Sequence, residues 1–112
     1  MKFLINYQHQ KNFRYESFAF ALKEAQKRSL KTLVETGVAR GKIKFFFFIK
    51  KNWKDGMSTL MFADYAHTFN GELHSCDISL ANINNSKNYT KKFFQSINYH
   101  HQDSLDFLKN FK

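Results

Sequence analysis

The fold expected for this chain depends on one stretch, Lys42-Ile43-Lys44-Phe45-Phe46-Phe47-Phe48-Ile49-Lys50-Lys51. Side chains alternate between the two faces of a β-strand, so both faces of this segment are apolar in the middle and cationic at the ends. Such a pattern is typical of a central strand with other elements packed on both sides. Four consecutive phenylalanines would point to all sides of a helix, where aromatic side chains also lose rotamer freedom. The sequence therefore predicts that residues 42–51 form the middle of a sheet.

Two dipeptides that follow this strand, Asp55-Gly56 and Asn70-Gly71, are typical of two-residue hairpin turns. Such turns need positive φ at both central positions, which these residue types adopt most readily. The two turns predict an antiparallel meander of three strands, at about 42–51, 57–67 and 72–81. Their register gives one continuous apolar face, formed by Phe46, Phe48, Met61, Ala63, Tyr65, Cys76, Ile78 and Leu80.

The remaining segments predict a short first strand and three helices. Phe3 to Tyr7 has the composition of an edge strand, and apolar residues recur at three- and four-residue steps over about 15–36, with Gly37 as the stop signal. Ser86 is a candidate cap for a helix at about 87–99, and a last short helix is expected at about 103–111. The expected order is β-α-β-β-β-α-α, an α+β fold in which the meander packs against helices in a single domain, residues 1–112.

The opposite face of the expected meander carries Phe45, Phe47 and Phe62. A bare apolar patch of that extent is rare on a monomer, so we expect a helix or another chain to cover it. These three rings are therefore a candidate partner face, and a homodimer through this face is one interpretation.

The composition bears on partners and location. Eighteen Lys and Arg residues against nine acids give a formal charge of +9, which favours nucleic acid or an acidic protein surface as the partner. A solvated basic surface, or the Lys-rich coding of an AT-rich phage or plasmid gene, explains the same excess without any partner. The single cysteine excludes an intramolecular disulfide, and the apolar run at the N-terminus is too short for a signal peptide. A cytoplasmic location without membrane attachment is therefore expected.

Two groups of residues on the expected second hairpin have side chains that occur in metal sites or in acid-base catalysis. His67, His74 and Cys76 are zinc-ligand types, but Cys76 falls in the apolar face and no fourth ligand accompanies them. Asp64 and Asp77 are expected to face each other, where two carboxylates acquire raised pKa values or hold a divalent ion. Like charges directly opposite are unfavourable, so a register slip that separates them is the simpler interpretation. The sequence therefore predicts no metal and no cofactor.

No catalytic motif, phosphate-binding loop or dinucleotide fingerprint is evident, so a non-catalytic binding protein is the expected class. The predicted contact surface consists of basic residues on two helices: Lys23, Lys27, Arg28, Lys31, Lys87, Lys91 and Lys92. Lysines at four-residue spacing form one row on a helix, and such a row can neutralise phosphates. The first interpretation is therefore a small phage or mobile-element protein that binds nucleic acid or a nucleic-acid-handling complex. A protein inhibitor of a host defence enzyme, of the anti-CRISPR type, is the alternative, and a nuclease without a recognisable motif is the second alternative.

Overall fold

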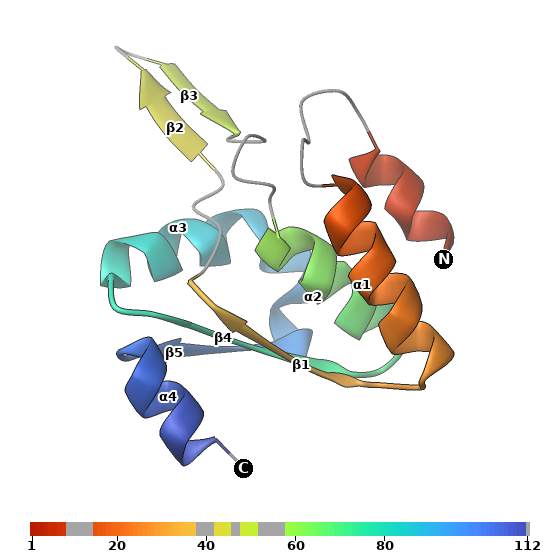
Figure 1. Ribbon diagram of the computed structural model, residues 1–112. Helices are drawn as coiled ribbons and strands as arrows, with labels where there is room; N and C mark the ends of the chain where they lie inside the picture. Colours follow the sequence, from red (N-terminus) through yellow and green to blue (C-terminus); the bar gives the residue numbers. More distant parts are fainter. Residues whose placement is uncertain (9–14, 38–41, 46–47, 52–57, 112) are drawn as a thin grey trace.

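The computed structural model describes residues 1–8, 15–37, 42–45, 48–51 and 58–111. The centre of the fold is a three-stranded parallel sheet in the order β1 (Thr32–Thr36), β4 (Glu72–Asp77), β5 (Ile97–His101). Parallel neighbours need a long crossover connection. Here α2 (Ser58–Thr68) lies between β1 and β4, whereas α3 (Leu80–Tyr89) and the 3-10 helix η3 (Lys91–Ser96) lie between β4 and β5. The chain therefore forms a β-α-β-α-β unit (Figure 1).

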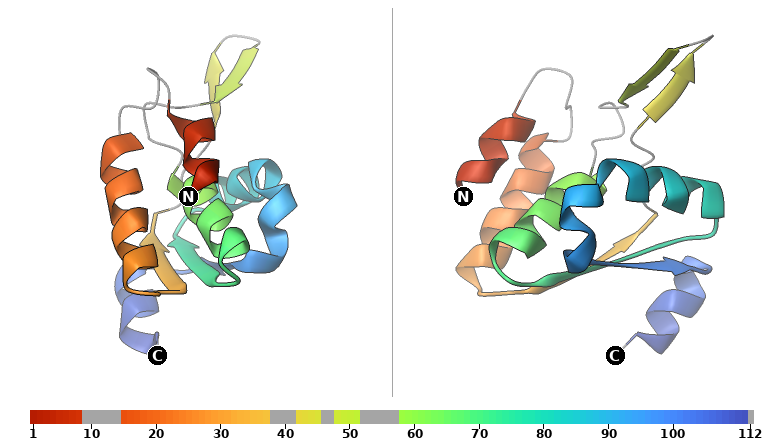
Figure 2. Two further views of the ribbon diagram at one scale, coloured as in Figure 1. Left: turned by 90° about the vertical axis from the view of Figure 1, so that its right-hand side faces the viewer. Right: turned by 180° about the vertical axis from the view of Figure 1, so that it is seen from behind.

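Helices lie on both faces of this sheet. In Figures 1 and 2, α1 (Tyr15–Lys27), α2 and α3 lie side by side across one face, and α4 (Ser104–Asn110) lies across the other. The N-terminal 3-10 helix η1 (Lys2–Tyr7) packs beside α1 and α2. The mixture of helix and sheet expected from the sequence is confirmed, but the sheet is parallel and not an antiparallel meander.

The core lies between the sheet and the three helices on its larger covered face. One cluster joins η1, α1 and α2, and consists of Leu4, Tyr7, Ala19, Leu22, Ala25, Met61 and Tyr65. The other joins α2 to η3 and to strands β4 and β5, and consists of Ala63, Ala66, Leu73, Phe93 and Ile97. Because α2 contributes to both clusters, this helix is the element around which the described core is built.

Residues 42–51 do not form the central strand. Lys42–Phe45 (β2) and Phe48–Lys51 (β3) form a separate antiparallel hairpin, with Lys42 opposite Lys51 and Phe45 opposite Phe48. This hairpin projects from the body of the molecule (Figure 1). The central strand is β4, whose Leu73, Ser75 and Cys76 have no exposed surface.

The second expected hairpin is also wrong, because Asn70-Gly71 ends a helix. The Gly71 N–H donates to the Ala66 C=O at 2.8 Å, and Asn70 has φ 56°. This left-handed cap requires the same positive φ as a hairpin turn, so one dipeptide serves either structure. The segment expected to be a strand at about 57–67 is therefore α2, and Asp55-Gly56 lies outside the described residues.

The helix expected at about 15–36 ends early, at Lys27. The Leu30 N–H donates to the Ala25 C=O at 2.8 Å and the Ser29 N–H to the Gln26 C=O at 3.0 Å, with Ser29 at φ 57°. This pair of bonds is a Schellman motif built on serine instead of glycine. Leu33 and Val34 then belong to β1, although they continue the helical spacing of α1.

The first element and the segment after β4 also differ from the sequence prediction, whereas the C-terminal helix agrees with it. Phe3 to Tyr7 is helical, and the helix expected at about 87–99 is replaced by the end of α3, by η3 and by the start of β5. Ser79 caps α3, whereas Ser86 is fully buried and hydrogen-bonds the Tyr99 hydroxyl at 2.7 Å. The helix expected at about 103–111 is confirmed as α4. Of the helices in the described ranges, none combines the length and the apolar composition that a membrane span requires.

Candidate functional site

A cavity of about 290 Å³ lies at the carboxyl ends of all three parallel strands. All three strand ends contribute to its wall. The lining residues are Thr36 at the end of β1 and Gly37 after it, Cys76 and Asp77 at the end of β4 and Ile78 after it, and Asp103 and Ser104 after β5. In open parallel sheets, ligands bind in the crevice outside the carboxyl ends of the strands. The position of this cavity therefore makes it the candidate site.

Gly37 forms the wall of the cavity at the end of β1. Its φ is +83°, its N–H donates to the Cys76 C=O at 2.8 Å, and a Cβ atom added there would meet nothing within 4 Å. Apart from its two chain neighbours, no described residue therefore fills the space beside Gly37. Glycine at this position lets a ligand approach the backbone directly.

The carboxylate of Asp77 is held in place by the start of α3. Its Oδ1 accepts the Ser79 N–H at 2.7 Å and the Asn82 side-chain amide at 3.5 Å. The Ser79 hydroxyl in turn accepts the Asn82 N–H at 3.3 Å, which fixes the first turn of α3. An ionised carboxylate only accepts hydrogen bonds, so Asp77 brings an oriented acceptor group to the wall of the cavity.

Asp103 is the N-cap of α4. Its Oδ1 accepts the Leu105 N–H at 2.9 Å and the Asp106 N–H at 3.4 Å. The apolar side chain of Ile78 has 72 % of its surface exposed at the same end of the sheet. The cavity therefore combines two oriented carboxylates with a glycine wall and an exposed aliphatic surface.

The charged residues in the described wall of the cavity are acidic. Burial raises the pKa of the Cys76 thiol, the backbone hydrogen bond with Gly37 lowers it, and the carboxylates of Asp77, Asp103 and Glu35 raise it. Of the described residues that line the cavity, none is Lys, Arg or His. Because the described wall carries two carboxylates and no cationic side chain, it repels a phosphate and favours a neutral or cationic ligand.

Glu35 joins β1 to α2. Its carboxylate is 7 % exposed and accepts hydrogen bonds from the hydroxyls of Ser58 at 2.5 Å and Thr59 at 2.6 Å, both at the start of α2, and of Ser75 on β4 at 3.0 Å. Burial raises the pKa of Glu35 even though these hydroxyls lower it. These hydrogen bonds hold the start of α2 against the end of β1. Glu35 lies two residues before Gly37, so the bonds also position the strand end that lines the cavity.

The three residues considered as zinc ligands, His67, His74 and Cys76, are not brought together. His67 lies on the exposed surface of α2 against the Phe93 ring, whereas His74 and Cys76 lie on β4. His74 instead pairs with His100 of β5, with Nδ1 and Nε2 3.1 Å apart. No group of His, Cys, Asp or Glu within the described ranges has the arrangement of a metal site.

The expected pair of aspartates is also separated. Asp64 lies on α2 and accepts the Tyr7 hydroxyl at 2.7 Å, whereas Asp77 ends β4 and lines the cavity. Of the candidate partner face, Phe62 lies on α2 and not on a strand, and it packs against Phe18 with ring centroids 5.4 Å apart. The side chains of Phe45 and Phe47 fall outside the described residues.

The predicted basic residues form no single row. Lys23 and Lys27 are exposed on α1, but Lys31 lies beyond the helix end and Arg28 lies 3.6 Å from Glu24. The second group consists of Lys87 on α3 and Lys91 and Lys92 on η3, all exposed. Lys87 and Lys91 line a different cavity beside β5, and Lys31 and Lys23 each line a further one, so none of these residues lines the cavity at the carboxyl edge.

The sequence contained a signal for the cavity that the hairpin interpretation obscured. A short β-branched run, Thr32-Leu33-Val34-Glu35-Thr36, is followed directly by Gly37, and the next buried strand ends in an acidic residue, Asp77. If both strands are parallel neighbours, Gly37 and Asp77 lie together at the carboxyl edge of the sheet, where open parallel sheets bind ligands. Comparison of the chain with protein-family models, with curated proteins and with solved structures finds no match.

Proposed function

We propose that the protein binds an adenosine-containing ligand with a cationic side, of which S-adenosylmethionine is the candidate, at the carboxyl edge of the parallel sheet. The observation that carries this proposal is the cavity whose wall combines Gly37, Asp77 and Asp103 from three strand ends.

The nucleoside part follows from geometry. An acidic residue at the end of the second strand of such a sheet accepts hydrogen bonds from ribose hydroxyls, and a glycine after the first strand allows close approach to the backbone. Asp77 ends β4 and Gly37 follows the neighbouring β1, so the two residues lie at the corresponding edge of this sheet, although the glycine-rich fingerprint itself is absent from the sequence. The exposed side chain of Ile78, next to Asp77, offers an apolar surface for the face of a base.

The cationic part follows from charge. Dinucleotides and nucleoside triphosphates bring phosphates, which the carboxylates of Asp77 and Asp103 repel. S-adenosylmethionine carries adenosine without phosphates, and its sulfonium, ammonium and carboxylate groups give it a net positive charge. The reaction class proposed with this ligand is methyl transfer, in which a nucleophile of the substrate takes the methyl group from the sulfonium and S-adenosylhomocysteine leaves.

Isothermal titration calorimetry of the whole chain with S-adenosylmethionine tests this proposal. We expect binding of S-adenosylmethionine, and weaker binding of NAD or ATP at equal concentration. Asp77→Asn keeps an acceptor for the Ser79 N–H but loses the charge, so it should weaken binding by at least about tenfold. Asp106→Asn is the matched control, because it removes a carboxylate from α4 outside the cavity wall. Equal affinity of both variants, or preference for ATP, would contradict the proposal.

A second candidate function is electrostatic binding of nucleic acid, as the sequence predicts. The formal charge of +9 and the exposed pair Lys23 and Lys27, one turn apart on α1, support it. Affinity for an oligonucleotide should then fall steeply with salt, because each neutralised phosphate releases counterions. Lys23→Glu with Lys27→Glu should abolish this binding and leave binding of S-adenosylmethionine unchanged. Inhibition of a host defence enzyme stays a prediction of the sequence.

A further inference from the structure

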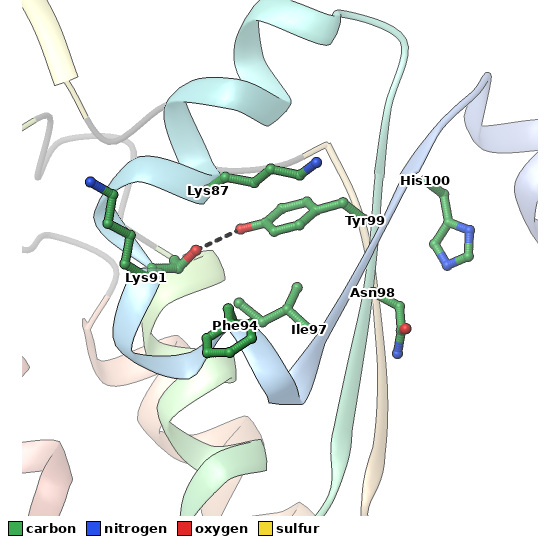
Figure 3. A pocket seen from close by; sticks show the side chains of 8 residues that line it. Lys87, Lys91, Phe94, Ile97, Asn98, Tyr99 and His100 are labelled. Atoms are coloured by element: carbon green, nitrogen blue, oxygen red, sulfur yellow. Dashed lines mark hydrogen bonds between the residues drawn. The ribbon is translucent and has the colours of Figure 1, made fainter.

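The larger cavity of about 710 Å³ lies beside strand β5, apart from the carboxyl edge of the sheet. Figure 3 shows Lys87, Lys91, Phe94, Ile97 and Tyr99 on one side of the strand, and Asn98 and His100 on the other. The ring of Phe94 has 71 % of its surface exposed, whereas Ile97 is buried. The cavity therefore has an apolar floor flanked by two lysines.

The ring of Tyr99 forms a fixed part of this floor. Its hydroxyl hydrogen-bonds Thr90 at 2.9 Å and Ser86 at 2.7 Å, and the Lys87 Nζ lies 5.8 Å from the ring centroid. A ring anchored at its polar end presents the same surface whether or not a ligand is bound. The site is therefore preformed, which lowers the entropic cost of binding.

The backbone of β5 has an open edge beside this cavity. In the described part of the chain β5 is the last strand of its sheet and pairs only with β4. The Gln102 N–H donates to the Asp77 C=O at 3.1 Å, so the backbone groups of alternate residues point toward β4. Those of Ile97, Tyr99 and His101 consequently point away from β4, and the view from behind in Figure 2 shows no element across this edge. Such an edge is a template for another strand.

We propose that the β5 edge, together with this cavity, binds an extended acidic peptide segment of a partner protein by adding it to the sheet as a fourth strand. Main-chain hydrogen bonds to the edge supply affinity, and pockets for alternate side chains supply specificity. An acidic side chain of the segment pairs with Lys87 or Lys91, and an apolar one two positions away covers Phe94.

Charge complementarity selects this occupant. A second copy of the chain would bring its own Lys87 and Lys91 to the shared edge, and each copy carries a formal charge of +9. A nucleic-acid strand could contact the lysines and the rings, but it has no regular row of donors to satisfy the C=O groups of the edge. An acidic strand satisfies both the lysines and the edge.

Nuclear magnetic resonance titration of the whole chain with the capped peptide Thr-Glu-Thr-Val-Thr-Glu-Thr tests this inference. The peptide reads the same in both directions, so it presents Glu, Val and Glu on one face in a parallel or an antiparallel alignment. We expect amide shifts concentrated at Ile97, Tyr99 and His101. Lys87→Glu with Lys91→Glu should weaken binding by at least about tenfold, because it replaces two positive charges of the cavity lining by negative ones.

Three controls separate this site from others. The matched variant Lys23→Glu with Lys27→Glu makes the same charge change on α1 and should bind the peptide as the wild type does. The peptide with Lys in place of Glu should not bind. The peptide with N-methylated amides on the edge-facing residues should lose binding, since it cannot donate to the strand.

Shifts located elsewhere, or equal binding of the N-methylated peptide, would overturn the inference. Amide shifts at β5 caused by a ten-nucleotide oligothymidylate but not by the peptide would overturn it as well, in favour of nucleic acid. S-adenosylmethionine binding is measured on the same samples, so failure of this edge site and failure of the proposed function are read separately.

Discussion

The carboxylate of Glu35 shows how a single residue organises the candidate site. It lies on β1, but its hydrogen-bond donors Ser58 and Thr59 belong to α2 and Ser75 belongs to β4. A carboxylate buried without partners would cost several kcal/mol, so these three hydroxyls make its position tolerable. The donors lie 23, 24 and 40 residues from Glu35 along the chain, so no local sequence pattern predicts that these side chains meet.

The raised pKa of Glu35 predicts a pH dependence of stability. Between its ordinary value of 4.5 and the raised folded-state value, the unfolded chain has lost the proton that the folded chain still holds. The free energy of unfolding should therefore fall as pH rises through this window and stay lower above it. Urea unfolding of the wild type and of Glu35→Gln at a series of pH values measures this, and the variant should lack the decrease. A parallel pH profile in the two proteins would show that Glu35 does not titrate in this way.

At the scale of elements, the sequence predicted those whose signals are local. The start of α1 and the position of α4 were predicted from apolar spacing, but α4 buries Phe107 and leaves Leu105 and Leu108 exposed. β1 was missed because Leu33 and Val34 continue the spacing of α1, and Ser29 takes a left-handed conformation that is usually assigned to glycine. α2 resembled a strand because its buried residues fall on several sides of the helix, at Thr59, Met61, Ala63, Tyr65 and Ala66. A helix buried on several sides loses the 3.6-residue pattern that identifies it.

The helix cap at Asn70-Gly71 is tested by substitution. An alanine at residue 71 would place its Cβ 2.2 Å from the Lys31 carbonyl oxygen, which also accepts the Glu72 N–H. Gly71→Ala should therefore lower the free energy of unfolding by about 2 kcal/mol or more. Asn70→Gly is the control, since glycine adopts the positive φ at that position at least as easily. Chemical denaturation measures both changes, and a harmless Gly71→Ala would refute the close approach of α2's end to β1's start.

The docking of α4 depends on two histidines. His74 and His100 lie against Phe107 and Phe111 of the α4 segment, with the His100 and Phe107 ring centroids 4.8 Å apart and the His74 and Phe111 centroids 5.0 Å apart. Burial lowers the pKa of His100, and the nearby charge of His74 lowers it further. As pH falls below the ordinary pKa of 6.5, His100 therefore gains its proton in the unfolded chain before it gains one in the folded chain.

Stability should consequently fall with pH in the window below 6.5, and α4 should loosen first. Hydrogen exchange of the α4 amides at pH 7.5 and pH 5.5 measures this loosening, after correction for the intrinsic pH dependence of exchange. In His100→Gln the difference between the two corrected values should shrink. Unchanged protection of α4 across this range in the wild type would contradict the account.

At the scale of the whole molecule, composition correctly predicted a mixed fold of helix and sheet but not its topology. The topology was missed because residues 32–36 and 97–101 are strands, whereas the sequence predicted helices at about 15–36 and 87–99. The dipeptides Asp55-Gly56 and Asn70-Gly71 also favoured hairpins, but β1, β4 and β5 are parallel. The candidate site depends directly on this topology. Only parallel strands bring the ends of β1, β4 and β5 to one edge, so Gly37, Asp77 and Asp103 could not be grouped before the crossovers were known.

The central claim is that the carboxyl edge of the parallel sheet is a ligand site. The most direct measurement is a nuclear magnetic resonance titration of the isotope-labelled chain with S-adenosylmethionine, followed residue by residue. The account predicts saturable amide shifts centred on Gly37, Asp77, Ile78 and Ser104, with the α1 amides around Lys23 unaffected. Shifts centred anywhere else, or no saturable shift at millimolar ligand, would contradict it.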